Sequence, residues 1–109
     1  MPYGFLATMR TTPGRRDDVV SILLADVGGL RAAGCEAYIV SVSDTDPDMI
    51  HVMEVWQSKE HHDASLELPE TRAAISQAMP MLTGEFTSQE LTVVGGLGLA
   101  HSDEGSPRS

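Results

Sequence analysis

Four segments of the chain, residues 3–11, 35–43, 49–57 and 85–94, are predicted to be β-strands from their apolar and β-branched residues and the turn residues at their ends. Segment 49–57 is the clearest, since it contains neither glycine nor proline. Successive side chains of a strand point to opposite faces. One face carries Ile50, Val52, Glu54 and Trp56, and the other carries His51, Met53, Val55 and Gln57. Bulky residues on both faces indicate that both are covered.

Apolar residues recur at helical spacing between the first two predicted strands. Thr12 is the predicted N-cap and Pro13 the first helical residue, where its missing N–H costs nothing. The predicted apolar stripe consists of Val20, Leu23, Leu24, Val27 and Leu30 or Arg31. Gly28 and Gly29 weaken the helix before its end, so we expect a kink or fraying there, and Gly34 is the expected left-handed stop.

A second helical region follows the third predicted strand. Ser58 is a residue type that caps the N-terminus of a helix. Pro69 interrupts the region and can serve as the first residue of a new helix. We therefore expect either a bent helix or two short helices, the second over residues 70–79.

The predicted order β-α-β-β-α-β is that of the ferredoxin-like α+β fold, a four-stranded antiparallel sheet with both helices on one face. The other face would leave a wide apolar patch exposed on a monomer. A second copy packed against that face removes it from water, so we expect a homodimer. Residues 1–95 form this domain, and the Gly/Ser-rich segment 96–109 is predicted to be a flexible tail.

Charge and cysteine content narrow the range of partners and compartments. A formal net charge of −9 over 109 residues argues against nucleic acid and anionic membranes, which both require a basic surface. Cys35 is the only cysteine, so no internal disulfide can form, and it is expected to be a small buried apolar residue. The chain shows neither a signal peptide nor an apolar stretch of membrane-spanning length, and a cytoplasmic location is expected.

Several motifs together resemble the antibiotic biosynthesis monooxygenase family. They are Gly34-Cys35-x-x-Tyr38, Ser43-x-x-Asp46-Pro47-Asp48, Ile50-x-Val52-x-Glu54-x-Trp56, and a helix opened by Ser58 that contains Glu60 and His62. The likeness runs from about residue 5 to residue 94. It implies a dimeric α+β barrel with a pocket between sheet and helices in each subunit. It also implies oxidation of electron-rich aromatics, such as quinols and anthrones, by O₂ without a metal or flavin cofactor.

The chain departs from the subgroups of this family in two ways. Quinol-oxidising members resemble one another in a pair of histidines on the second helical region, and here those positions are Ser65 and Glu70, with Pro69 retained between them. Haem-degrading members share a set of asparagine, tryptophan and histidine. This chain contains no asparagine, so haem degradation is not expected.

The candidate site residues lie on the third predicted strand and the helical region after it, except Tyr38, which lies on the second predicted strand. His62 and Glu54 are the candidates for proton transfer. The candidate substrate-binding residues are Trp56, Tyr38, Arg72 and Ser65. Each has a structural alternative: a solvated surface position for His62, an ion pair with Arg72 for Glu54, and core packing for the two aromatic residues. His61 and His62 are not expected to share a metal, because adjacent helical side chains point about 100° apart.

Two functions remain open from the sequence. The first is a cofactor-independent monooxygenase acting on an aromatic or quinol-like molecule. The second is a non-catalytic dimeric barrel that binds a small hydrophobic ligand or serves as an interaction module.

Overall fold

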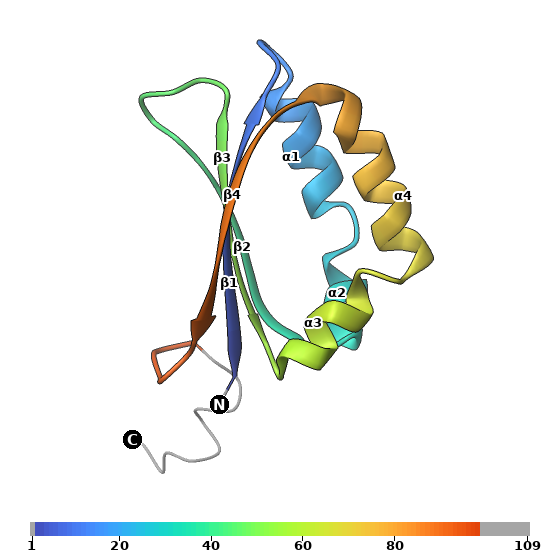
Figure 1. The fold of residues 1–109 in the computed structure, drawn as a ribbon, viewed down its shortest axis with the longest axis vertical. Helices are drawn as coiled ribbons and strands as arrows, with labels where there is room; N and C mark the ends of the chain where they lie inside the picture. Colours follow the sequence, from blue (N-terminus) through green and yellow to red (C-terminus); the bar gives the residue numbers. More distant parts are fainter. Residues whose placement is uncertain (1, 99–109) are drawn as a thin grey trace.

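The computed structural model describes residues 2–98. Its strands are β1 (Tyr3–Thr11), β2 (Cys35–Val42), β3 (Met49–Trp56) and β4 (Leu82–Thr92). Its helices are α1 (Arg16–Leu24), α2 (Val27–Ala32), α3 (Lys59–Ser65) and α4 (Pro69–Ala78), followed by the 3₁₀ turn Met79–Met81. The strands form one antiparallel sheet in the order β2-β3-β1-β4, and all helices lie on one of its faces (Figure 1). The predicted ferredoxin-like fold is confirmed.

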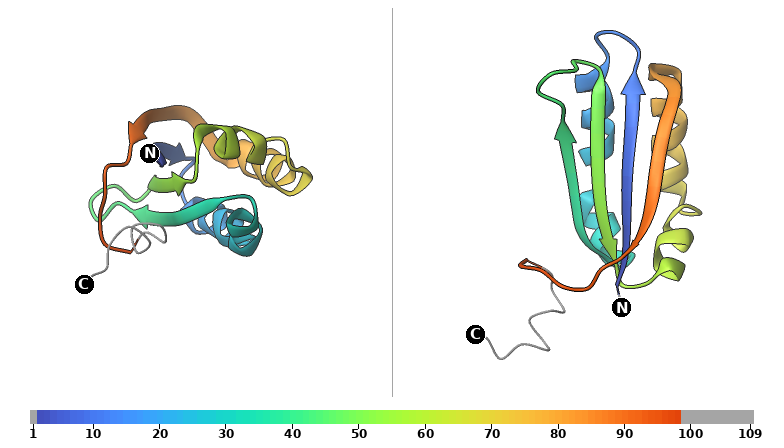
Figure 2. Two further views of the ribbon diagram at one scale, coloured as in Figure 1. Left: turned by 90° about the horizontal axis from the view of Figure 1, so that it is seen from below. Right: turned by 60° about the vertical axis from the view of Figure 1, so that its left-hand side comes forward.

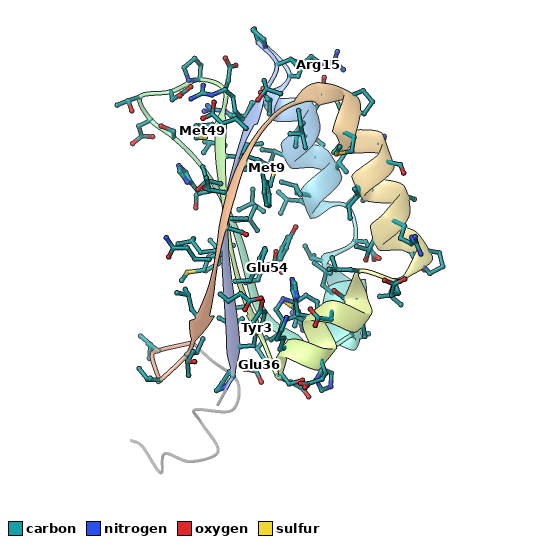
Figure 3. All side chains as sticks on the ribbon, in the orientation of Figure 1. Tyr3, Met9, Arg15, Glu36, Met49 and Glu54 are labelled. Atoms are coloured by element: carbon teal, nitrogen blue, oxygen red, sulfur yellow. The ribbon has the colours of Figure 1, made fainter. Side chains whose placement is uncertain are left out.

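The register of the sheet brings residues from three strands into one row on the helix side. Glu54 of β3 lies opposite Phe5 of β1 and Tyr38 of β2. Trp56, two residues along, lies opposite Tyr3 and Cys35. Figure 3 shows Met9 and Glu54 on the side of the sheet that faces the helices.

The core lies between this face and the helices and has two parts. The first is formed by Ala7, Met9, Val19, Ile50 and Val52, and the second by Tyr3, Cys35 and Trp56. Ile50, Val52 and Trp56 are all buried, as the alternation along 49–57 predicts. Burial of each such large apolar side chain contributes about 1.5–3 kcal/mol to stability.

The first helical region begins and breaks at positions that differ from those predicted from the sequence. α1 begins at Arg16, because residues 12–14 form a turn in which Thr12 donates its backbone N–H to the carbonyl of Met81. Gly14 completes this turn with φ +80°. The break comes at residues 25–26, not at the glycine pair. Asp26 caps α2 by accepting from the N–H of Gly29 at 3.3 Å.

Because the helical phase restarts at this break, the predicted apolar stripe does not stay on one face. Val19, which lies outside that stripe, is fully buried, whereas Leu24 and Val27 are almost half exposed. Gly34 ends α2 with φ +108°, as predicted.

The second helical region follows the prediction closely. The hydroxyl of Ser58 accepts from the N–H of His61 and caps α3. Pro69 is the first residue of α4, and Leu68 before it is extended, as is usual before proline. β4 begins three residues earlier than predicted, at Leu82.

The face of the sheet without helices is apolar at its centre. Leu6, Met53 and Ile39 form one row across β1, β3 and β2 on this face. Met53 is 43% exposed and Ile39 54% exposed. His51 also lies on this face, as predicted, within 3.0 Å of the hydroxyl of Thr8. Figure 2 shows this face with the helices behind it.

Residues 99–109 of the predicted tail lie outside the described residues. Within residues 2–98, none of the helices combines the length and the apolar character needed to cross a bilayer.

Candidate active site

A cavity of about 750 Å³ lies between the sheet and the helices. Most of its wall is apolar and comes from both layers, including Phe5, Met9 and Val52 of the sheet and Ile22, Leu66 and Ile75 of the helical layer. Its volume falls within the range of small-molecule sites, about 300–1,000 Å³.

Five of the six predicted site residues lie on this wall, namely Tyr38, Glu54, Trp56, His62 and Ser65. Arg72 does not line the cavity. Its Nη1 pairs with Oε1 of Glu67 at 3.1 Å, and both side chains are exposed. The structure therefore brings the first five residues to one place and leaves Arg72 outside it.

Glu54 is a half-buried carboxylate in this largely apolar wall. Nε1 of Trp56 donates to its Oε1 at 2.8 Å, so the expected ion pair with Arg72 is wrong. Burial raises the pKa of Glu54, and the hydrogen bond from Trp56 and the charge of His62 act in the opposite direction. A carboxylate with a raised pKa inside a cavity is suited to accept a proton from a ligand.

His62 is buried, contrary to the expectation of a solvated surface histidine. Only 7% of its surface is exposed. Its ring packs 4.7 Å from the ring of Phe5 and 5.2 Å from that of Tyr3, and meets Trp56 edge-on at 5.6 Å. Its Nδ1 lies 3.1 Å from Oδ1 of Asp63. Nε2 has no hydrogen-bond partner among the described residues, so it is the nitrogen left for a ligand.

Asp63 and three further residues hold His62 in place, and none of the four was predicted from the sequence to belong to the site. Asp63 and Glu90 both pair with Nζ of Lys59 at 3.3 Å. The hydroxyl of Tyr3 donates to Glu90 at 3.2 Å. These contacts tie α3 to β4 and β1. The i,i+4 spacing of Lys59 and Asp63 predicts their pairing, whereas nothing in the sequence signals the contact with Glu90.

Tyr38 and Ser65 present their hydroxyls differently. Burial and the neighbouring Glu54 raise the pKa of Tyr38, so its phenol stays neutral, and its hydroxyl has no hydrogen-bond partner among residues 2–98. Ser65 donates its hydroxyl proton to the carbonyl of His62 at 2.6 Å. In this arrangement Tyr38 is available to donate to a ligand, and Ser65 can only accept.

His61 and Cys35 lie outside this arrangement. Nδ1 of His61 lies 2.7 Å from the hydroxyl of Ser58, and the side chain is exposed. Burial raises the pKa of Cys35 to about 11, so its thiol is not ionised at neutral pH. Within residues 2–98, no three or more His, Cys, Asp or Glu side chains are grouped so that they could hold a metal ion.

The comparisons with known proteins agree with the geometry. The sequence profile described as antibiotic biosynthesis monooxygenase matches residues 2–77. A solved structure from Chloroflexus aurantiacus J-10-fl, titled for this family, is 38% identical, with a TM-score of 0.83 over 91% of this chain and 99% of that one.

Two more distant structures support the fold alone. One, from Caulobacter crescentus CB15, is 21% identical, with a TM-score of 0.78 over 86% of this chain and 91% of that one. Rv0793 from Mycobacterium tuberculosis is also 21% identical, with a TM-score of 0.76 over 89% and 99% of the two chains. No curated protein matches the chain. Since the family profile covers more than half of the sequence, the chain belongs to the antibiotic biosynthesis monooxygenase family.

Proposed function

We propose that the protein is a cofactor-independent monooxygenase that oxidises an aromatic, quinol-like small molecule with O₂. The observation that carries this proposal is the meeting of two proton acceptors, the Glu54 carboxylate and Nε2 of His62, in one apolar cavity of about 750 Å³. A fused aromatic ring system fits such a volume.

The chemistry begins with removal of a proton from the substrate. Glu54 or Nε2 of His62 takes the proton of a phenol or of an enolisable ring carbon, which leaves an electron-rich anion. The anion transfers an electron to O₂, and the two radicals combine into a peroxide anion on the ring. This anion takes back the proton held by the base and becomes a hydroperoxide. Loss of water from that hydroperoxide gives the quinone. For an anthrone the balance is one substrate plus one O₂ to one anthraquinone plus one H₂O.

The surrounding side chains have defined parts in this scheme. The N–H of Trp56 holds Glu54 in position through its 2.8 Å hydrogen bond. Asp63, at 3.1 Å from Nδ1, stabilises His62 when Nε2 receives a proton. Tyr38, neutral and without a partner among the described residues, donates to the oxygen that becomes negative. Ser65 accepts from a substrate hydroxyl.

The proposed assembly is a homodimer in which a second copy covers the sheet face without helices. The row of Leu6, Met53 and Ile39 leaves apolar surface exposed there. Val94 and Leu97, which follow β4, are also strongly exposed and would gain burial from the same partner.

Oxygen uptake with a panel of hydroquinones and anthrones tests the proposed reaction. We expect uptake by the wild type, and a loss of about 10²–10⁴-fold in kcat for the variant that lacks the operative base, either Glu54→Gln or His62→Gln. His61→Gln is the matched control, because it removes the neighbouring exposed histidine. Uptake that neither substitution lowers would contradict the proposal. No uptake with any compound would favour the non-catalytic ligand-binding barrel.

A further inference from the structure

The ionisable side chains of the cavity wall are mainly carboxylates. Glu54 lies on the sheet side, and Asp26 and Glu70 lie on the helix side. Glu85 also lines the cavity, but its carboxylate pairs with Arg10 at 3.0 Å. No lysine or arginine among residues 2–98 is part of the wall. The chain as a whole has a formal charge of −9, which adds to the negative potential at the cavity.

The basic side chains nearby are engaged elsewhere. Lys59 pairs with Asp63 and Glu90, and Arg72 pairs with Glu67. Among residues 2–98, His62 is the one wall residue with a basic side chain, and it already has two carboxylate neighbours, Asp63 at 3.1 Å and Glu54. An acidic ligand would therefore find no unshared positive charge on the wall.

The immediate surroundings of Glu54 are aromatic. Phe5 and Tyr38 lie opposite it on the two neighbouring strands, and Trp56 donates to one of its oxygens. Its other oxygen, Oε2, accepts no hydrogen bond from the described residues. A carboxylate flanked by aromatic faces is the combination that recognises hydroxyl groups and organic cations.

We infer that this cavity selects its ligand by charge, accepting aromatic molecules that are neutral or carry a basic nitrogen and rejecting those that carry a carboxylate, sulfonate or phosphate. The inference rests on the proposed use of this cavity as the substrate site. It narrows the substrate class to phenols, quinols and aromatic amines without an acid group.

A matched set of three probes with one naphthalene body tests the inference without turnover. The probes are 1-naphthalenemethanol, 1-naphthylmethylamine as its ammonium ion, and 1-naphthoate, titrated by calorimetry at neutral pH. We expect the alcohol and the ammonium to bind, each at least roughly tenfold tighter than the carboxylate, because like charges brought together without a counter-ion are strongly disfavoured.

Variants locate the origin of the preference. Glu54→Gln should lower the ammonium-to-carboxylate ratio by roughly threefold or more, because it removes the negative charge that favours the ammonium ion and opposes the carboxylate. Glu70→Gln should also lower the ammonium-to-carboxylate ratio, and it provides the test if Glu54→Gln does not fold. Glu60→Gln, on the exposed side of α3, makes the same change in net charge and should leave the ratio unchanged.

The outcomes separate this inference from the proposed reaction. Charge selection without oxygen uptake by any compound would keep the inference and contradict the proposed reaction. Oxygen uptake with equal or tighter binding of 1-naphthoate would contradict the inference alone. Failure of all three probes to bind would also overturn it, as would a ratio that Glu54→Gln and Glu70→Gln leave unchanged.

Discussion

Glu54 and Trp56 lie two residues apart on one strand, so their side chains point to the same face and the indole N–H reaches the carboxylate. The alternation along 49–57 predicts this shared face. It does not predict the partner, because Arg72 is equally plausible from the sequence. The partner is decided by α4, whose course places Arg72 beside Glu67 on the surface.

Replacing Glu54 with glutamine should change the pH dependence of stability. Burial raises the pKa of Glu54 in the folded state above its ordinary value. The contribution of Glu54 to the free energy of unfolding is therefore fully present below its unfolded-state pKa and is lost as the pH rises through its folded-state pKa. Glu54→Gln stays neutral and still accepts from Trp56. We therefore expect a higher Tm than wild type at pH 7.5, by a few degrees, and a difference that shrinks toward zero near pH 4.

Thermal unfolding of both proteins across this pH range measures the difference. The two proteins have the same fold and the same aromatic residues around position 54. The effects of all other titratable groups on the pH dependence of Tm therefore cancel in the comparison. A Tm difference that stays constant from pH 4 to pH 7.5 would show that ionisation of Glu54 has no part in it.

Among the elements, α3 matters most to the site because it carries His62 and Ser65. It has only seven residues, from Lys59 to Ser65, so its ends contribute a large share of its stability. Ser58 accepts from the N–H of His61 at the N-terminus. Lys59 forms an ion pair with Asp63 within the helix and another with Glu90 of β4, so it connects α3 to the sheet.

Removing this cap should therefore destabilise the protein. Ser58→Ala leaves the N–H of His61 without its acceptor, and we expect a loss of about 1 kcal/mol in the free energy of unfolding. Urea titration measures this loss. Ser76→Ala is the matched control, because Ser76 is exposed within α4 and alanine is the better helix former, so its effect should be neutral or slightly stabilising. Equal effects at the two positions would contradict the role of the cap.

At the scale of the whole molecule, the sheet has helices on one face only (Figure 1). The apolar row on the other face predicts self-association. Ile39→Glu places a charge in this apolar row, on the edge strand β2, where Ile39 is 54% exposed in a single subunit. We expect the wild type to sediment as a dimer at micromolar concentration and Ile39→Glu to sediment as a monomer.

Leu24→Glu is the control for this experiment, because Leu24 is 47% exposed on α1, on the side of the helices. It should leave the dimer intact. A wild type that sediments as a single subunit would contradict the proposed assembly, as would an equal loss of association in both variants.

The amino-acid sequence by itself determined the elements that depend only on interactions between neighbouring residues. Alternation selects the buried face of β3, Ser58 caps α3, Pro69 starts α4 and Gly34 ends α2, because each depends on the backbone geometry of a few consecutive residues. The order of these elements determined the fold, since few topologies accommodate β-α-β-β-α-β.

Only the tertiary structure decided the site in detail. The start of α1 depends on a hydrogen bond from Thr12 to Met81, nearly seventy residues away. The burial of His62 depends on aromatic residues of β1 and β3, and the acidic character of the cavity depends on Asp26 and Glu70 meeting Glu54 across it. These contacts join segments that are distant along the chain, and local periodicity and capping carry no information about which distant side chains packing brings together.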